Sequence, residues 1–443
     1  MGIDFEMGWV KRDLRSVDAE RSSRVLSVTG NIIESQGFVA GMGAMCVIDD
    51  PSGGHPEVLA EVVSFDKETI KLIPYHETTG LSRRSRVRFF SESVGLSVSD
   101  DLLGRVINPL GEIIDSQQAK RDSRNATHFS GSKIPPLEKA SINQPLDVGV
   151  RVINALLTMA KGQRIGLVAG SGVGKSTLMA MITKHTDADV VIVGLIGERG
   201  REAREFIEDT LGPEGLRKAI IVLATSDTTA VMRRRGAEVC HILAEYFRDK
   251  GQNVLLLCDS LTRVAHAQRE IGLAVGEPPT SKGYPPSVFT ELPKLMERGG
   301  MGRPGSGSIS SIYTVLAEYD EGMDPIVEIA RATLDGQIML SRQLADAGHY
   351  PAIDLNGSIS RLAAKVVSDE VLDAATRYRR YWSLYEQNKD IINIGAYKAG
   401  ADESLDVAVR MRSSMVKFAR QSVDLAAGMD ESAESLLALM GES

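Results

Sequence analysis

The 443-residue chain is poor in the residues that build metal centres, disulfide scaffolds and aromatic surfaces. Its three cysteines and seven histidines are scattered without ligand spacing, which argues against any metal site other than one for Mg²⁺. No apolar run approaches the roughly 20 residues of a membrane-spanning helix, and the first residues lack the apolar core of a signal peptide. We therefore expect a cytoplasmic protein of a reducing compartment that contacts a membrane only peripherally.

Neither the charge nor the aromatic content favours nucleic acid as a partner. The formal net charge is −8 and only 5% of the residues are aromatic. Two basic runs, RRSRVR (83–88) and RRR (233–235), are the exceptions. Such runs more often form a solvated strand face or a subunit contact, so we expect no nucleic-acid binding.

The first part of the chain has the pattern of a small β-barrel. Residues 24–95 alternate apolar and polar side chains in short runs such as RVLSVTGNIIES and EVLAEVVSF, broken by Gly, Pro and Asp. Residues 102–115 are predicted to add a strand and turn that close the barrel, which gives a domain over 24–115. Residues 116–149 are polar and suit an extended linker.

The pattern changes near residue 150. Fully apolar runs such as DVVIVGLIG, AIIVLATS and NVLLLCDS alternate with helical stretches, which indicates a parallel sheet covered on both faces over residues 150–364. Residues 365–443 have helical periodicity and almost no strand signal. The expected fold class is α/β, with an N-terminal barrel, a central P-loop (RecA-like) domain and a C-terminal helical domain.

The segment AGSGVGKST (169–177) follows an apolar strand and opens a helix, which is the pattern of a phosphate-binding loop. Its glycines let backbone N–H groups close around phosphate oxygens. Lys175 is expected to contact the β- and γ-phosphates of ATP, and the Ser176 hydroxyl to bind Mg²⁺. The predicted nucleotide-binding residues are Gly170, Ser171, Gly172, Val173, Gly174, Lys175, Ser176 and Thr177.

Two further strands end in carboxylates. Glu198, in IGERGRE, is placed to polarise the attacking water, with Arg199 near the phosphates and Glu202 supporting Mg²⁺ through water. A surface salt-bridge cluster is the alternative interpretation of this segment. Asp259, in LLLCDSLTR, is expected to hold the Mg²⁺ shell, and Arg263 to reach the γ-phosphate.

The first residues carry an apolar stripe with spacings of four and three. We predict that residues 1–23 form a partner-binding helix, and a tail packed on its own barrel is an equal alternative. The stripe is made by Ile3, Met7, Val10, Leu14 and Val17.

Together these segments resemble the flagellar protein-export ATPases and the type III secretion ATPases, which are related to the catalytic subunit of rotary ATP synthases. The resemblance rests on five segments that occur in this order: AGSGVGKST, GLIGERGREAREFIED, the stretch from DSLTRV to FTELP, LDGQIMLSRQLA and HYPAIDLNGSISR. It implies a hexameric ring that couples ATP hydrolysis to unfolding or delivery of export substrates. The stretch AQREIGLAVGEPPTSKGY looks more like the flagellar branch, and a non-flagellar secretion ATPase is the alternative.

The resemblance also implies roles for residues outside the phosphate loop. Tyr350 is expected to line the adenine pocket, and Phe418 matches a second aromatic residue near the base. Arg361 corresponds to an arginine finger that reaches the γ-phosphate of a neighbouring copy. Because one chain carries both Glu198 and Arg361, identical copies can complete each other's sites head-to-tail, and a homohexamer is the expected closure.

The implied partners are an export regulator related to the peripheral stalk, a coiled-coil central stalk protein, the membrane export gate, and export substrates with their chaperones. The acids of EYDEGMDPI, namely Asp320, Glu321 and Asp324, are expected to meet the basic stalk. These partners place the protein at the cytoplasmic face of the inner membrane.

Three other functions compete with protein export. A rotary synthase subunit is disfavoured because KAGADESLD stands where the acidic lever segment is expected. An RNA translocase requires exposed stacking aromatics, whereas Phe38, Phe65 and Tyr75 fall within apolar strand patterns. A non-catalytic nucleotide-binding scaffold is disfavoured by Glu198.

Overall fold

The computed structural model describes most of the chain from Ser22 to Gly441. Residues outside the description are 1–21, 39, 50–56, 67, 77, 79, 93–94, 116–126, 130, 132, 318–323 and 442–443. The predicted N-terminal helix lies outside the described residues, and so do Asp320 and Glu321. The limits proposed for the linker and the N-terminal segment therefore stay predictions.

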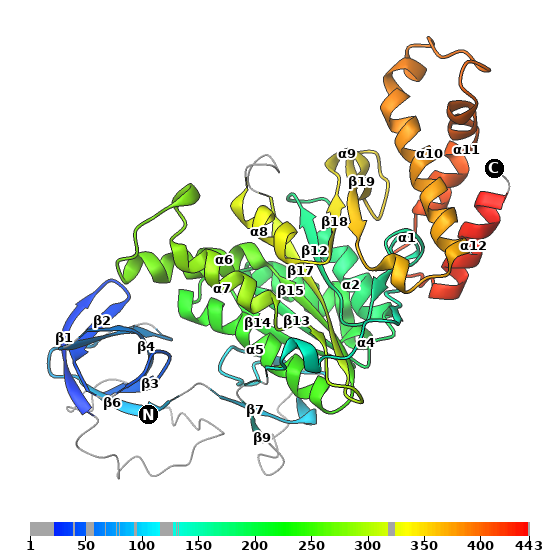
Figure 1. Cartoon of the computed structure of the whole chain (residues 1–443). Coiled ribbons are helices and arrows are strands. Elements are labelled where there is room, and N and C mark those ends of the chain that lie inside the picture. The colour runs from blue at the N-terminus through cyan, green and yellow to red at the C-terminus, as the bar shows by residue number, and fades with distance from the viewer. Residues whose placement is uncertain are drawn as a thin grey trace.

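A closed six-stranded barrel forms the N-terminal domain, as predicted (Figure 1). Alternating side chains fill its interior, and Ile33, Met45 and Leu72 are fully buried. Tyr75 is buried as expected, but the side chain of Phe65 is 55% exposed. The strands, in barrel order, are β1 (Ser22–Thr29), β2 (Ile32–Gln36), β5 (Thr69–Pro74), β4 (Val58–Phe65), β3 (Met45–Asp49) and β6 (Arg86–Ser91).

A nine-stranded sheet forms the central domain. Its six inner pairings are parallel, and strand β19 joins one edge antiparallel. The order is β19 (Ile353–Ser360), β18 (Gly336–Leu340), β12 (Arg164–Ala169), β17 (Ser308–Leu316), β15 (Asn253–Asp259), β13 (Val190–Ile196), β14 (Ala219–Ala224) and β8 (Val106–Ile107), with β16 (Gly300–Met301) paired to β17.

The prediction that residues 102–115 close the barrel is wrong. Strand β8 pairs in parallel with β14 at the edge of the central sheet, and the barrel closes between β1 and β6. The cause is local, because β14 is an apolar strand whose edge groups need partners, and Val106 and Ile107 supply them while staying buried. Two further sheets have two strands each. One pairs β7 (Leu96–Val98) with β9 (Thr127–Phe129), and the other pairs β10 (Pro145–Leu146) with β11 (Met159–Ala160).

Helices cover both faces of the central sheet, as the continuous apolar strands predict (Figure 1). One face packs against α1 (Arg151–Leu156), α2 (Lys175–His185), α3 (Gly200–Glu205), a π-helical segment (Phe206–Leu211) and α4 (Gly212–Leu216). The other packs against α5 (Ala230–Asp249), α6 (Leu261–Ala274), α7 (Pro286–Met296) and α8 (Pro325–Thr333).

A C-terminal helical domain lies at the opposite end of the molecule from the barrel (Figure 1). A short helix α9 (Arg342–Asp346) precedes β19, and α10 (Asp369–Asn393), α11 (Glu403–Ala419) and α12 (Met429–Gly441) follow it. Tyr378 and Phe418 are buried between these helices, with their ring centroids 5.5 Å apart. The apolar core of this domain is continuous with the α2 face of the sheet.

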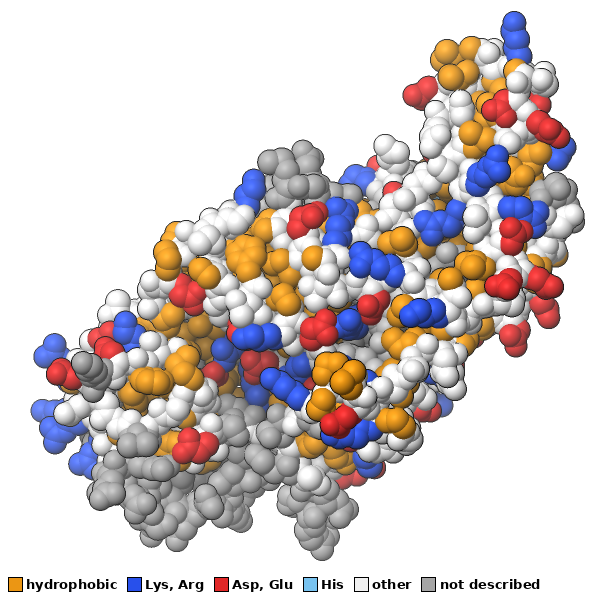
Figure 2. All heavy atoms as spheres, viewed as in Figure 1, with side chains coloured by type: hydrophobic (Ala, Val, Ile, Leu, Met, Phe, Trp, Pro, Cys, Tyr) orange, Lys and Arg blue, Asp and Glu red, His pale blue; other side chains and the backbone are white. Residues whose placement is uncertain are grey.

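The basic run 83–88 lies on the barrel, where Arg83, Arg84 and Arg86 are exposed. Figure 2 shows Lys and Arg side chains at this end of the molecule. Their exposure fits both forms expected from the sequence, a solvated strand face and a subunit contact.

Asp324 differs from expectation. Its carboxylate caps α8 by accepting hydrogen bonds from the N–H groups of Ile326 (2.9 Å) and Val327 (3.3 Å), and the residue is 3% exposed. The prediction that Asp324 meets a basic stalk is wrong, because this carboxylate is buried as a helix cap.

Candidate functional site: the phosphate loop and the ends of three strands

The phosphate loop connects the end of β12 to the start of α2. Gly172 and Gly174 have φ of 74° and 92°, a region that L-residues rarely adopt. A Cβ added at Gly170 or Gly172 would meet nothing within 4 Å, so the outer side of the loop is open to a ligand. Val173, 1% exposed, anchors the loop in the core.

The N-terminus of α2 faces the same space. Within the described part of the chain, no side chain caps this helix, and Ser176 is exposed on its first turn. Uncapped N–H groups at a helix N-terminus form a binding site for phosphate oxygens.

Lys175 brings the carboxylates of two neighbouring strand ends together. Its Nζ lies 3.2 Å from Oε1 of Glu198, just beyond the end of β13, and donates a second hydrogen bond to Oδ1 of Asp259, the last residue of β15. Parallel strands end at the same edge of a sheet, which is why these residues meet as predicted. Their side chains are 11%, 18% and 5% exposed respectively.

One cation between two carboxylates leaves an excess negative charge. Burial and the nearby Asp259 raise the pKa of Glu198 above its ordinary value, although Lys175 opposes the shift. Burial lowers the pKa of Lys175, but Asp259 and Glu198 outweigh it, so the pKa lies above its ordinary value. Lys175 therefore stays charged at neutral pH, and the cluster favours an additional cation such as Mg²⁺.

Of the two arginines predicted near this cluster, one is packed against it and the other is exposed on the surface. The stem of Arg263 packs against Gly197, where an added Cβ would lie 2.7 Å from the Cβ of Arg263. The Nε of Arg263 is buried and has no hydrogen-bond partner among the described residues, as expected of a group that awaits an anion. Arg199 instead has a side chain that is 79% exposed and pairs with Glu202 at 3.3 Å.

Of the two predicted aromatic contacts, Tyr350 lies at the phosphate loop. Its ring Cε1 would be 3.3 Å from a Cβ added at Gly174, and Tyr350 is 44% exposed. Phe418 is 7% exposed and its ring lies in the helical core, with the Arg151 guanidinium 5.9 Å from its centroid. A role of Phe418 at the base stays a prediction that no contact of this ring supports.

Arg361 lies away from the phosphate loop of its own chain. Strand register pairs Ser360 with Gly336, at the beginning of β18, whereas the loop follows the end of the parallel strand β12. The exposed guanidinium donates to the carbonyls of Leu334 at 3.4 Å and Arg331 at 3.3 Å. Arg361 is thus placed on the surface at the opposite end of the sheet.

Comparison with known proteins agrees with this geometry. Residues 25–90 match the beta-barrel domain of the ATP synthase alpha/beta family, and residues 149–360 match the nucleotide-binding domain of that family. Residues 367–438 match the T3SS EscN ATPase C-terminal domain.

The chain is 47% identical across 418 residues to the flagellum-specific ATP synthase of Pseudomonas aeruginosa, with 94% of this chain and 92% of that protein covered. The chain belongs to the family of flagellar and type III secretion ATPases. A type 3 secretion system ATPase of Xanthomonas euvesicatoria is 42% identical over 96% of this chain and 95% of that protein. The assembled ATPase EscN in complex with its central stalk EscO, from enteropathogenic E. coli, superimposes with a TM-score of 0.86 at 39% identity, covering 94% of this chain and 100% of that one.

As a member of this family, the chain is an ATPase with a nucleotide-binding central domain. Thr314 is a site residue that the sequence did not reveal: its hydroxyl donates to Oδ1 of Asp259 at 2.5 Å, and it is fully buried on β17. A lone threonine inside an apolar strand carries no signal of its own. Among the described helices, none combines the length and apolar character needed to span a bilayer.

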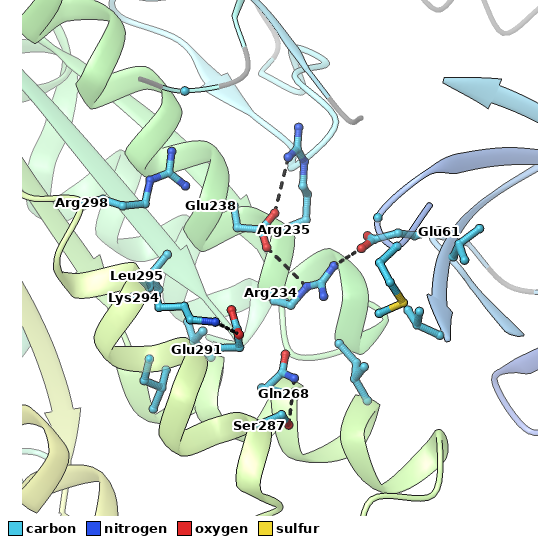
Figure 3. A pocket seen from close by; sticks show the side chains of 18 of the residues that line it. Glu61, Arg234, Arg235, Glu238, Gln268, Ser287, Glu291, Lys294, Leu295 and Arg298 are labelled. Carbon is cyan, nitrogen blue, oxygen red and sulfur yellow. Dashed lines mark hydrogen bonds and ion pairs between the residues drawn. The ribbon is translucent and has the colours of Figure 1, made fainter. Parts of the chain in front are cut away.

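In this ATPase a cavity of about 850 Å³ lies between the barrel and helices α5, α6 and α7, away from the phosphate loop (Figure 3). Figure 3 shows Arg234 of α5 pointing toward Glu61 of the barrel, while its other side pairs with Glu238 at 3.5 Å. Arg233 pairs with Glu270 at 2.7 Å. The RRR run therefore forms ion pairs within the chain, most notably between the barrel and the central domain.

Proposed function

We propose that this chain hydrolyses Mg²⁺-ATP to drive protein export by a flagellar type III apparatus. The observation that carries the proposal is Lys175, held between Glu198 and Asp259 directly beside the phosphate loop. The flagellar branch is favoured over a non-flagellar secretion system by the 47% identity to the Pseudomonas protein, against 42% for the Xanthomonas secretion ATPase.

The residues of the loop fit a nucleoside triphosphate. Backbone N–H groups of the loop and of the first turn of α2 bind the phosphates, and Lys175 turns from its carboxylates to the β- and γ-phosphates. Ser176 and Asp259 would hold Mg²⁺, with Glu202 acting through water, and the bound ion would supply neutralisation of the phosphate charge. Tyr350 contacts the adenine base beside Gly174.

Chemistry at the γ-phosphate falls to three side chains. Glu198, whose pKa is raised, accepts the proton of the attacking water once Lys175 has moved toward the phosphates. Arg263 supplies its unpartnered N–H group to that phosphate, and Arg199 leaves its exposed ion pair with Glu202 to approach from the surface. Electrostatic stabilisation of this kind supplies most of the catalysis in phosphoryl transfer.

The position of Arg361 supports a ring of identical subunits. An arginine that lies at the far end of its own sheet serves as a finger only for a neighbour, and head-to-tail contacts of one chain close into a ring. We take the closed form to be a hexamer at the cytoplasmic face of the membrane. Its partners are a stalk-like regulator on residues 1–23, a central stalk, the export gate, and substrates with chaperones.

Complementation between two inactive variants tests both the active site and the ring. Arg361→Ala and Glu198→Gln are each expected to be inactive alone. Mixed rings regain partial activity, because some interfaces combine an intact Glu198 with an intact Arg361. Failure of demonstrably mixed rings to regain activity, or full activity of Arg361→Ala alone, would contradict a finger acting between subunits.

A further inference from the structure

A short segment of the central domain, residues 342–350, lies across the phosphate loop, and we call it the strap. At its start the Arg342 guanidinium donates a hydrogen bond to the carbonyl of Ser171, at the tip of the loop. At its end the ring of Tyr350 covers Gly174, where an added Cβ would lie 3.3 Å from Cε1. The strap therefore holds the loop at two points.

The other side of the strap is attached to the C-terminal helical domain. The carbonyl of Tyr350 accepts a hydrogen bond from the N–H of Gln421 at 3.1 Å, and the carbonyl of Ala347 accepts one from Arg420 at 3.5 Å. His349, 5% exposed, packs edge-to-face against Trp382 of α10 with the ring centroids 6.1 Å apart.

The helices behind these contacts are joined as one unit. The guanidinium carbon of Arg412, on α11, lies 3.9 Å from the ring centroid of Trp382 and 4.4 Å from that of Tyr385, both on α10. The same guanidinium also pairs with Glu386. Stacking and charge together hold α10 against α11. A movement of these helices therefore carries Trp382 with it and reaches the strap through His349.

We propose that Arg342 is a positioning residue that couples the C-terminal helical domain to the phosphate loop through the strap. The exposed guanidinium has its hydrogen bond to a loop carbonyl rather than to a carboxylate. A charged donor on a backbone carbonyl fixes the position of that peptide and adds no group to the chemistry. The inference rests on the proposed function, since it assigns a means of regulating the same nucleotide site.

Coupling of this kind is reciprocal. If the helical domain biases the loop, nucleotide in the loop also shifts the helical domain, and Trp382 reports that shift. The chain has two tryptophans, Trp9 and Trp382. Replacing Trp9 by Phe leaves Trp382, which packs against the strap, as the sole tryptophan fluorophore.

The experiment uses full-length protein carrying Trp9→Phe and a non-hydrolysable ATP analogue with Mg²⁺. We expect the emission of Trp382 to change when the analogue binds. In Arg342→Ala this change is lost at saturating analogue, while the dissociation constant of a fluorescent ATP analogue rises about fivefold, as expected from one hydrogen bond. In steady-state assays KM rises by a similar factor and kcat changes little, because Arg342 makes no contact that is specific to the transition state.

Two further variants separate positioning from general damage. Arg342→Lys keeps a charged donor and is expected to restore part of the emission change. Arg380→Ala removes a comparable arginine hydrogen bond, to Ser404 at 3.3 Å within the helical domain, and is expected to behave as wild type. Unfolding temperatures without nucleotide confirm that each variant is folded.

The results separate the two proposals. Three outcomes overturn the coupling and leave the proposed function intact. The parent protein binds the analogue without a change in Trp382 emission; or Arg342→Ala keeps the full emission change; or Arg380→Ala loses the emission change as completely as Arg342→Ala does. If the parent protein binds no ATP analogue at all, the proposed function falls and the inference falls with it.

Discussion

Two largely buried cations of this ATPase have similar surroundings, yet the carboxylates beside them, Glu198 and Glu61, have net pKa shifts of opposite sign. Lys175 lies between Glu198 and Asp259, and a hydroxyl from Thr314 also donates to Asp259. Despite the nearby ammonium, the pKa of Glu198 is raised, because burial and the second carboxylate outweigh the attraction of Lys175.

Arg234 likewise lies between Glu61 and Glu238, and the Tyr75 hydroxyl donates to Glu61 at 2.7 Å. Here burial raises the pKa of Glu61, but the charges of Arg234 and its neighbour Arg235 outweigh that effect. The net pKa of Glu61 is therefore below its ordinary value. Glu61 therefore stays ionised and paired.

The difference lies in what each cluster lacks. The barrel cluster has enough cations for its acids, and it fastens two domains. The loop cluster has too few, and it lies beside an open glycine loop. An incomplete buried network is the mark of a site that binds something.

Removing the acid of the loop cluster is expected to have the largest effect. Glu198→Gln keeps the hydrogen bond to Lys175 and loses the base, so kcat falls by roughly 10²–10⁴ while ATP still binds. Lys175→Ala instead weakens binding itself. Turnover assays and a fluorescent ATP analogue distinguish the two, and near-normal turnover of Glu198→Gln would refute its role.

Breaking the barrel cluster is expected to affect stability rather than chemistry. Arg234→Met leaves Glu61 buried without its partner, which costs roughly 3–5 kcal/mol of unfolding free energy. KM for ATP changes little in the folded protein. The double variant Arg234→Met/Glu61→Gln recovers much of the loss in denaturant unfolding, and a double variant no more stable than Arg234→Met would show that the pair is not the cause.

Acid is expected to weaken the molecule through His241. Burial, with Arg298 nearby, lowers the pKa of this imidazole to about 3, while its ring bonds Ala237 and the Tyr313 hydroxyl at 2.8 and 2.9 Å. The unfolded chain takes up this proton below pH about 6.5 and the folded chain does not. The contribution of neutral His241 to the free energy of unfolding is thus complete above that pH. It falls on acidification by up to about 1.4 kcal/mol per pH unit.

His241→Gln tests this assignment because glutamine cannot titrate. Unfolding free energies at several pH values between 7.5 and 5 are expected to fall less steeply in the variant than in wild type. Equal slopes would assign the acid sensitivity to other groups.

The exposed pair of Arg199 and Glu202 is expected to matter least for stability. Its side chains are 79% and 41% exposed, so Glu202→Gln changes the unfolding free energy by less than about 1 kcal/mol. If Glu202 supports Mg²⁺ through water, the Mg²⁺ concentration for half-maximal activity rises several-fold and excess Mg²⁺ restores turnover. A loss as deep as that of Glu198→Gln would give Glu202 a more direct role.

The parts of the site that the sequence predicted share one physical basis. Glu198 and Asp259 each end an apolar strand, and parallel strands of one sheet place their ends at one edge. The phosphate loop likewise begins where the apolar strand β12 ends, at the same edge of the sheet. Strand ends are readable from a sequence because hydrophobicity stops there abruptly.

Other contacts had no comparable signal. Thr314 and Arg342 reach the site through single bonds to residues 55 and 171 positions earlier in the chain. Strand β8 has only two residues, too few for any periodicity to indicate which sheet it joins. The pairing of Arg234 with Glu61 depends on how the barrel docks, which local pattern does not specify.

The edge position of β8 has a practical consequence for dissecting this protein. Val106 and Ile107 cover the outer backbone edge of β14, whose sequence is AIIVLA. A fragment that starts after residue 107 exposes an apolar, uncharged strand edge, which is the template on which chains aggregate. A fragment that starts near residue 95 retains the cover, so the soluble catalytic piece is expected to begin within the segment that the sequence pattern assigned to the barrel.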